Sequence, residues 1–261
     1  MSCMSDGGRY VIVYNGELYN TEELRAALID KGCQFNGHSD TEVVLNAYAV
    51  YGPECVYQFN GIFAFAVWDE KKRRLFFARD RIGVKPFFYT LDNGKFIFSS
   101  EIKGILAATG KQPEVDTQGI MEIMLIGPGR TPGYGVFKGI EELRPGCFGF
   151  FDENGIRLHE YWSLCDRKHA ENFEQTAEHV RFLVTDAIKR QLVSDVPIGT
   201  FLSGGLDSSL ISSVASRAMK ENGKILKTFT VSYKNNDRFF KATKFQPNSD
   251  SDFVGRMVDY L

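Results

Sequence analysis

One stretch of nine residues, FLSGGLDSS at positions 201–209, constrains the fold of this chain more than any other feature. The apolar residues 196–200 before it predict a strand, and residues 210–215 after it predict the first turns of a helix. Glycines at such a junction let the backbone approach an anion closely, and the free N–H groups at a helix start favour negative charge. The stretch therefore predicts an anion site within a strand, turn and helix unit.

The polar residues of this turn indicate which anion it binds. Ser203, Ser208 and Ser209 supply hydroxyl donors, and Asp207 is suited to hold Mg2+ against phosphate oxygens. A Walker phosphate loop is excluded, because no Gly-Lys-Ser or Gly-Lys-Thr follows. The string resembles the SGG-x-D-S loop of the ATP pyrophosphatases, which cleave ATP between the α and β phosphates. An ordinary turn is the alternative interpretation.

Composition narrows the function classes. The 261 residues are enough for one large or two ordinary domains, and a net charge of −2 gives no indication of nucleic acid or membrane binding. We see no apolar run that would span a bilayer and no signal peptide. The scattered cysteines lead us to expect a cytoplasmic protein. The five cysteines form no Cys-x-x-Cys and the four histidines no metal-like spacing, which favours reduced thiols over disulfides or zinc.

The first 160 residues alternate in a way typical of an α+β fold. Residues 10–14 predict a strand that ends at Asn15-Gly16. Residues 61–68 with 74–79, and 86–89 with 96–98, predict antiparallel hairpins, the second around an Asn-Gly turn. Further strands are expected from 148 to 162. Four helices are expected. The first is capped by Thr21 and stopped by Gly32, and the second begins with a capping box of Ser39 with Glu42 and ends at Gly52. Two short helices are expected at 101–108 and 117–126.

The remaining residues predict an α/β fold. A long amphipathic helix is expected at 175–192, followed by the glycine-rich unit, a helix to about residue 222 and a strand at 228–233. This order of strand, helix and strand predicts a parallel sheet. Residues 234–252 form a polar run, and the chain then ends on the expected start of another helix.

Two separate parts of the chain resemble one family. Residues 13–20 (VYNGELYN), 39–42 (SDTE) and 79–86 (RDRIGVKP) resemble the glutaminase domain of glutamine-dependent asparagine synthetases, and residues 203–209 resemble their synthetase domain. The resemblance runs from about residue 10 to 233. It implies an N-terminal-nucleophile hydrolase fold followed by an ATP-pyrophosphatase fold.

The resemblance also implies a reaction. Ammonia released from L-glutamine passes through a tunnel to a second domain, where ATP with Mg2+ has converted L-aspartate to β-aspartyl-AMP. The products are L-asparagine, AMP and pyrophosphate. Nucleic acid and membrane are not expected as partners, and a homodimer of the full-length enzyme is left open.

Site residues follow by matching motifs. The side-chain amide of Asn15 and the N–H of Gly16 are implied as the oxyanion hole, while Glu17 and Asp40 are implied to bind the α-ammonium group of glutamine. Without the resemblance, Asn15-Gly16 would be an ordinary turn and Asp40 a helix-capping carboxylate.

The ATP site is implied in the same way. Leu202 and Val231 match positions beside adenine and ribose, and Asp207 holds Mg2+ through pyrophosphate. Arg81, Lys85 and Glu101 lie in motifs near the domain interface of relatives, although a structural role explains them equally well. The pyrophosphate loop comprises Ser203, Gly204, Gly205, Leu206, Asp207, Ser208 and Ser209.

The chain departs from the family at both ends. The resemblance implies a nucleophilic cysteine that becomes residue one and that lies roughly sixty or more residues before the Asn-Gly-Glu motif. Cys3 lies only twelve positions (15 − 3) before Asn15. We therefore expect 1–164 to be a type-2 glutamine amidotransferase domain without its nucleophile segment, 165–174 a linker, and 175–261 a synthetase domain without its C-terminal part. This piece is expected to lack glutaminase activity and asparagine synthesis.

Other readings stay open. A related enzyme that amidates another carboxylate or closes a β-lactam ring would have the same two-part plan, although the Asn-Gly-Glu motif favours an amidotransferase. A non-catalytic protein that binds nucleotide or glutamine is the non-enzymatic alternative. Argininosuccinate, GMP and NAD synthetases and tRNA-thiolating enzymes fit poorly, because they lack the first half.

Overall fold

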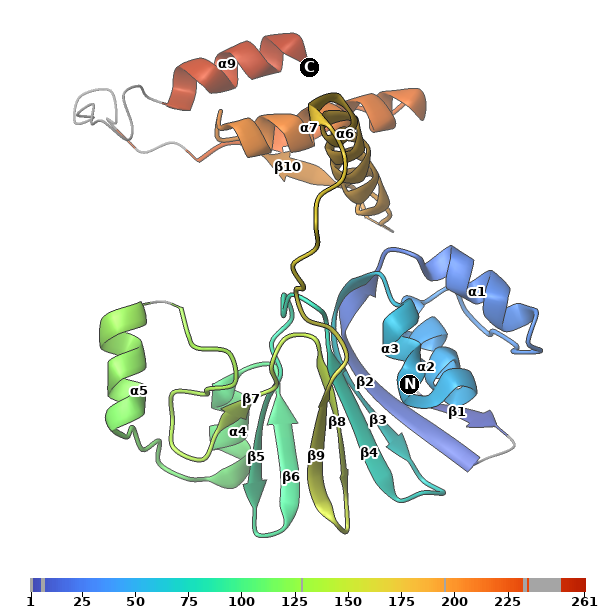
Figure 1. Ribbon diagram of the computed structural model, residues 1–261, viewed down its shortest axis with the longest axis vertical. Coiled ribbons are helices and arrows are strands. Elements are labelled where there is room, and N and C mark those ends of the chain that lie inside the picture. The colour runs from blue at the N-terminus through green and yellow to red at the C-terminus, as the bar shows by residue number, and fades with distance from the viewer. Residues whose placement is uncertain (1, 6–7, 128, 195, 232–233, 235–249) are drawn as a thin grey trace. The chain divides into compact units, whose positions relative to one another are not determined.

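The computed structural model describes residues 2–5, 8–127, 129–194, 196–231, 234 and 250–261 (Figure 1). The chain divides into two compact units, Met1–Asp166 and Arg167–Leu261. The strands of the first unit are β1 (Ser2–Ser5), β2 (Gly8–Leu18), β3 (Gly61–Asp69), β4 (Arg74–Arg79), β5 (Phe88–Asp92), β6 (Lys95–Ser99), β7 (Glu141–Glu142), β8 (Cys147–Asp152) and β9 (Gly155–Glu160). Its helices are α1 (Thr21–Ile29), α2 (Asp40–Tyr51), η1 (Gly52–Glu54), α3 (Cys55–Gln58), α4 (Ile102–Thr109), α5 (Thr117–Met121) and the π-helical η2 (Glu122–Ile126).

Two antiparallel sheets form the centre of the first unit. One has the strand order β1-β2-β3-β4-β8-β9 and the other the order β6-β5-β7. Figure 1 shows α1, α2 and α3 beside the first sheet, while α4 and α5 lie beside the second. Because every described strand pair in this unit is antiparallel, the α+β class predicted from the hairpins is confirmed.

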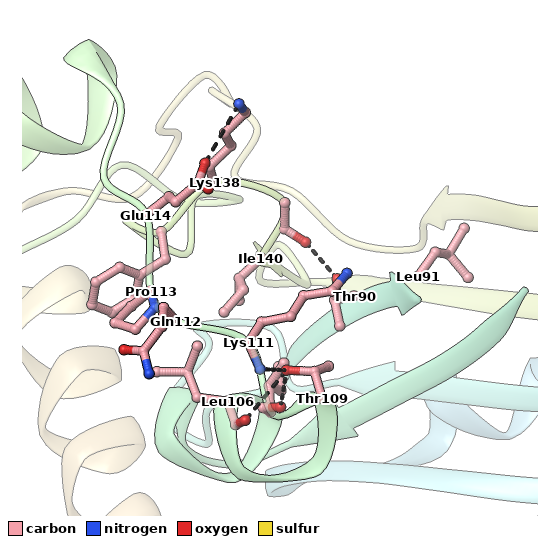
Figure 2. A pocket seen from close by; sticks show the side chains of 13 residues that line it. Thr90, Leu91, Leu106, Thr109, Lys111, Gln112, Pro113, Glu114, Lys138 and Ile140 are labelled. Carbon is pink, nitrogen blue, oxygen red and sulfur yellow. Dashed lines mark hydrogen bonds and ion pairs between the residues drawn. The ribbon is translucent and has the colours of Figure 1, made fainter. Parts of the chain in front are cut away.

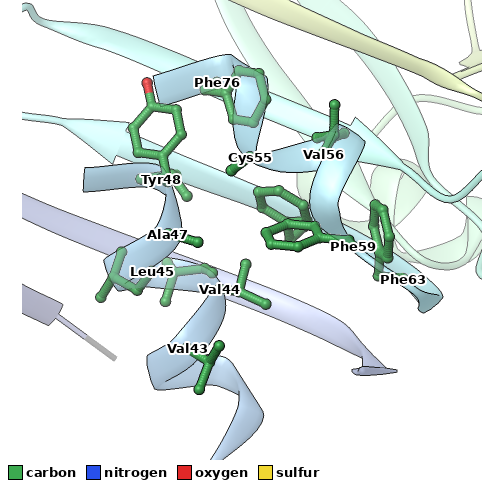
Figure 3. Close-up of a cluster of buried hydrophobic side chains, with 14 of the residues drawn as sticks. Val43, Val44, Leu45, Ala47, Tyr48, Cys55, Val56, Phe59, Phe63 and Phe76 are labelled. Carbon is green, nitrogen blue, oxygen red and sulfur yellow. The ribbon is translucent and has the colours of Figure 1, made fainter. Parts of the chain in front are cut away.

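Alternate residues of β3 face different layers, which explains why nearly the whole strand is buried. Phe63 and Phe65 pack towards the helices, whereas Ala64 and Ala66 pack towards the second sheet. The helix-side cluster in Figure 3 includes Phe59, whose ring meets that of Phe63 edge to face at 5.5 Å. Each such phenylalanine stabilises the fold by roughly 1.5–3 kcal/mol when it leaves water.

The cluster between the two sheets is built from stacked aromatic rings. Phe77 of β4 lies 5.4 Å from Phe87 and 4.9 Å from Phe96 between ring centroids. A third cluster joins Phe88 of β5 to Ile105 of α4. The unit therefore has four layers, with helices outside and two sheets inside.

The turn at Asn93-Gly94 has the backbone that the sequence predicted. Asn93 has φ 49° and Gly94 φ 76°, so both central residues are left-handed, as a two-residue hairpin with matching twist requires. The turn joins β5 and β6, which pair antiparallel.

The other Asn-Gly pair does not end a strand, and that prediction was wrong. β2 continues through Asn15 and Gly16 to Leu18, with Gly16 opposite Phe63. A Cβ on Gly16 would lie 2.6 Å from the carbonyl oxygen of Ile62 and 2.8 Å from Cα of Phe63. Glycine is needed here for close approach of two strands instead of for a turn.

Two helix caps also differ from the prediction. Asn20 occupies the cap position of α1, and the hydroxyl of Thr21 donates to the carbonyl of Leu18. Ser39 does cap α2 by accepting from the N–H of Thr41. The side chain of Glu42, however, accepts from the N–H groups of residues 36 and 37, so it completes no capping box with Ser39.

The second unit contains a short parallel sheet. Strands β10 (Gly199–Phe201) and β11 (Lys227–Phe229) pair in parallel around α7 (Leu206–Glu221), which confirms the α/β class predicted there. They are shorter than expected, and the predicted strand end at Ser232 and Tyr233 lies outside the described residues. The other helices are α6 (Phe173–Arg190), which begins inside the expected linker with an Asn172–Gln175 capping box, and α9 (Asp250–Tyr260).

In the part of the chain that the structure describes, no helix combines the length and the apolarity needed to cross a bilayer.

Candidate functional site

The N–H of Gly16 points to an edge of β2 that no described strand covers. Its partner Phe63 donates its N–H to Oδ2 of Asp80 at 3.2 Å and accepts from the N–H of Asp80 at 2.8 Å. Because both backbone groups of Phe63 face β4, Gly16 and Phe63 are a non-hydrogen-bonded pair, and the backbone groups of Gly16 face away from β3. The neighbouring strand β1 reaches only Val11 on that side.

Asp40 lies at the same edge. Its Oδ2 accepts from the N–H of Leu18 at 3.2 Å and from the hydroxyl of Tyr14 at 2.8 Å. Leu18 is two residues beyond Gly16, so the N–H groups of both residues point in the same direction. The first residue of α2 thus brings a carboxylate to the edge where the N–H of Gly16 lies.

Asn15 and Glu17 project from the face of the sheet that lies opposite α2. Both side chains are exposed, and Nδ2 of Asn15 donates to Oγ of Ser100 at 3.2 Å. The structure therefore brings the four predicted residues together at the C-terminal end of strand β2. Asn15 and Glu17 lie on one face of the sheet, and Asp40 lies at the edge beside Gly16. Hydrogen-bond donors and carboxylates at such an edge suit a ligand that carries both a carbonyl group and an ammonium group.

Two tyrosines keep their protons at this site. Burial, followed by the charge of Asp40, raises the pKa of Tyr14 far above its ordinary value. Burial and the charge of Glu17 also raise the pKa of Tyr19. Both hydroxyls are therefore neutral donors across the physiological pH range.

The RDRIGVKP motif forms a loop organised by a buried carboxylate that the sequence reading did not single out. Asp80 is 1% exposed. Its Oδ1 accepts from the N–H groups of Ile82, Gly83 and Val84, and its Oδ2 accepts from those of Phe63 and Lys85. The signal in the sequence was an aspartate directly before a Gly-containing loop, a pattern typical of side-chain to backbone turns.

The flanking arginines of this motif also bind backbone carbonyls. Arg79 is buried, forms an ion pair with Glu142 at 3.2 Å and donates to the carbonyl of Leu143. Arg81 donates to the carbonyls of Tyr57 and Phe59. These contacts favour the structural reading of Arg81. Glu101 lies at the cap position of α4 and pairs with Lys103 on the surface.

The register places Cys3 far from the edge at Gly16. Cys3 lies opposite Tyr10 on β2. Six residues separate Tyr10 from Gly16 (16 − 10), which corresponds to about 20 Å along a strand. A nucleophile must approach its target within about 3–3.5 Å, so the backbone of Cys3 lies outside the reach of this site.

The glycine-rich turn of the second unit has the geometry of an anion site. Gly204 has φ 79° and Gly205 precedes the first residue of α7, a helix of 16 residues. The hydroxyls of Ser203 and Ser208 lie 3.1 Å apart, and Oγ of Ser208 also accepts from the N–H of Ser203. The turn therefore joins a glycine without Cβ hindrance, two hydroxyls and a helix N-terminus.

The other residues predicted for ATP lie around this turn. Leu202 is buried, donates its N–H to the carbonyl of Phe229 and accepts from the hydroxyl of Thr230. Val231 lies beyond β11 and is 70% exposed, so its placement inside a strand was wrong. Asp207 is exposed in the first turn of α7, and Leu206 and Ser209 belong to the same turn. No cluster of three metal-binding side chains occurs among the described residues.

A cavity of about 520 Å³ in the first unit contains none of the predicted site residues (Figure 2). Its apolar lining includes Ile105 and Ile140, and its lysines are already paired. Lys111 lies 2.6 Å from Asp92, and Lys138 lies 3.7 Å from Glu114. The cavity therefore offers volume without an unbalanced charge.

Comparisons with known proteins agree with the two units. Residues 2–162 match the glutamine amidotransferase domain family, and residues 179–261 match the asparagine synthase family. The chain is 50% identical over 260 residues to glutamine-hydrolysing asparagine synthetase 3 of Bacillus subtilis, covering 99% of this chain and 42% of that protein. It is also 34% identical to amidase chry2 of Gibberella zeae, covering 84% of this chain and 32% of that protein.

Among solved structures, the chain is similar to a glutamine phosphoribosylpyrophosphate amidotransferase from Bacillus subtilis. The identity is 15% and the TM-score 0.44, over 94% of this chain and 51% of that chain. The chain spans less than half the length of each of the two curated relatives, since it covers 42% of the asparagine synthetase and 32% of the amidase.

Proposed function

The chain belongs to the family of glutamine-hydrolysing asparagine synthetases, and on this premise we propose that its first unit binds L-glutamine and its second unit binds ATP. The proposed reaction is ATP-dependent amidation of L-aspartate to L-asparagine through β-aspartyl-AMP, with ammonia taken from glutamine. AMP and pyrophosphate are the other products.

One observation carries the glutamine proposal. The N–H of Gly16 faces an open strand edge that it shares with Asp40, and Asn15 lies beside it. In the proposed site, the Asn15 amide and the Gly16 N–H stabilise the oxyanion formed at the glutamine amide carbon. Glu17 and Asp40 hold the α-ammonium group.

This chain alone is proposed to bind glutamine without hydrolysing it. The support is the position of Cys3, about 20 Å along β2 from Gly16. Ammonia release by the purified chain that disappears in Cys3→Ala would contradict this proposal.

Glutamine binding is testable by titration calorimetry on residues 1–261. Asp40→Asn removes the negative charge and keeps the side-chain size. The ion pair between Asp40 and the α-ammonium group should contribute about 1.4 kcal/mol, so the affinity for glutamine should fall about tenfold or more. Asp30→Asn is the matched control, because Asp30 is an exposed aspartate on α1's C-terminal end. Equal affinity in both variants would refute the assignment of Asp40.

The ATP proposal places the β and γ phosphates on the turn formed by residues 203–209, with Mg2+ between them and Asp207. The turn fits an anion because Gly204 is left-handed and the hydroxyls of Ser203 and Ser208 converge. When bound, Mg2+ would neutralise charge on the departing pyrophosphate. Leu202 and Val231 are proposed beside adenine and ribose.

Calorimetry with ATP and Mg2+ tests this site. Binding should be lost in Asp207→Asn and kept in Glu221→Gln, which changes a carboxylate at the other end of α7. No heat with the wild-type chain at millimolar ATP would contradict a nucleotide site in this unit.

A second candidate differs in the acceptor. That candidate amidates a carboxylate other than that of aspartate. It is kept because a protein named amidase chry2, and not asparagine synthetase, is 34% identical to this chain. We also propose a cytoplasmic location, supported by the free thiols of Cys33, Cys55, Cys147 and Cys165.

A further inference from the structure

We propose that Tyr14 is a positioning residue that presets the Asp40 carboxylate for an α-ammonium group. The inference rests on the proposed glutamine site and adds a residue that the sequence motif did not identify. Tyr14 lies on β2 next to Asn15, and its hydroxyl donates to Oδ2 of Asp40 at 2.8 Å.

The two oxygens of Asp40 have different surroundings. Oδ2 accepts from both the Tyr14 hydroxyl and the Leu18 N–H, whereas the one contact of Oδ1 among the described residues is a long one of 3.4 Å from the hydroxyl of Thr41. Two donors on one oxygen fix the plane of the carboxylate, because rotation would break both bonds. Oδ1 is thereby left to accept from a ligand cation.

The environment of Tyr14 makes this arrangement persistent. The ring is half-buried between β2 and α2, and burial raises its pKa so that the hydroxyl stays protonated. A neutral hydroxyl donates to the carboxylate and cannot repel it. Among the described residues, the other donor to Oδ2 from β2 is the Leu18 N–H, which already makes its own bond to that oxygen.

Donation by Tyr14 has two opposite effects on ligand binding. It withdraws some charge from the carboxylate, which weakens attraction to ammonium, and it removes the cost of ordering the carboxylate when the ligand arrives. Preorganisation of a partly buried charged acceptor is the larger effect where the ligand must meet one oxygen in a fixed direction. Loss of the hydroxyl should therefore weaken binding.

Tyr14→Phe tests the proposal, because it removes one oxygen and keeps the packed ring. The ligands are L-glutamine and 4-carbamoylbutanoate, which is glutamine without its α-ammonium group. We expect calorimetry to show glutamine binding about tenfold weaker in the variant, equal to about 1.4 kcal/mol. The affinity for 4-carbamoylbutanoate should be unchanged, so the variant should lose discrimination between the two ligands.

Tyr48→Phe is the matched control, because it also removes a buried tyrosine hydroxyl that contacts Arg74 and leaves Asp40 untouched. Unchanged discrimination in Tyr14→Phe overturns the positioning role alone. Absence of glutamine binding by the wild-type chain overturns the proposed function and, with it, this inference. Equal weakening of both ligands in Tyr14→Phe and in Tyr48→Phe would reduce Tyr14 to a packing residue and overturn the inference.

Discussion

Removal of the Asp80 carboxylate should destabilise the first unit more than any surface substitution. In Asp80→Ala, five backbone N–H groups lose the carboxylate as acceptor at once, and of these Gly83 keeps a bond to the carbonyl oxygen of Asp80 at 3.2 Å. The N–H of Phe63 lies in the buried sheet and cannot reach water, which costs about 1–3 kcal/mol. The four loop donors can be hydrated, because Ile82 and Val84 are 74% and 54% exposed, and their net loss is about 0.5 kcal/mol each.

The expected total for Asp80→Ala is therefore about 3–5 kcal/mol of unfolding free energy, in the range for breaking a buried charged network. Asp80→Asn should cost about 2–3 kcal/mol, because an amide that keeps the three Oδ1 bonds turns its NH2 group towards the N–H groups of Phe63 and Lys85. Neither value includes a change in the fold of the second unit.

Urea unfolding followed by tryptophan fluorescence measures this quantity in the first unit. Both tryptophans of the chain, Trp68 and Trp162, lie between Met1 and Asp166. Asp30→Asn serves as the control, and its unfolding curve should overlay the wild type. A shift below about 1 kcal/mol for Asp80→Ala would refute the claim that this carboxylate holds the loop.

Two further predictions concern packing and thiol chemistry. Gly149→Ala should lower the unfolding free energy by about 1–3 kcal/mol in thermal melts, because the new Cβ would lie 2.5 Å from Cζ of buried Phe77. Gly37→Ala is the control and should have little effect, because the nearest atom to its new Cβ lies 3.6 Å away. Iodoacetamide should label exposed Cys165 first and leave Cys55 unmodified until the unit unfolds, because burial raises the pKa of the Cys55 thiol; mass spectrometry that found Cys55 labelled as fast as Cys165 would contradict its burial.

The two Asn-Gly pairs show what local sequence predicts and what it does not. At Asn93-Gly94 the flanking strands are only five residues long each, so local turn chemistry decides the structure, and the prediction was confirmed. At Asn15-Gly16 the same dipeptide continues a strand, because pairing with β3 and close contact with Ile62 outweigh the local preference. Tertiary pairing of this kind is not visible in a single sequence.

The sequence predicted part of the candidate site and missed one residue of it. Motif resemblance placed Asn15, Gly16, Glu17 and Asp40 in one site, and the structure brings them to one end of β2. It did not reveal Tyr14, whose position before Asn15 reads as an ordinary buried strand residue. Its role depends on α2 bringing Asp40 to the same edge from 26 residues away.

Close strand contact at Gly16 also decides how a saturation mutagenesis map of β2 should be interpreted. Any replacement of Gly16 adds a Cβ that meets backbone atoms of Ile62 and Phe63 at 2.6–2.8 Å, so every variant is expected to be depleted regardless of ligand. Intolerance at Gly16 is thus uninformative about chemistry. At Asn15 the side chain is exposed and the backbone imposes no such limit, so depletion of Asn15 variants that fold normally would report on function alone.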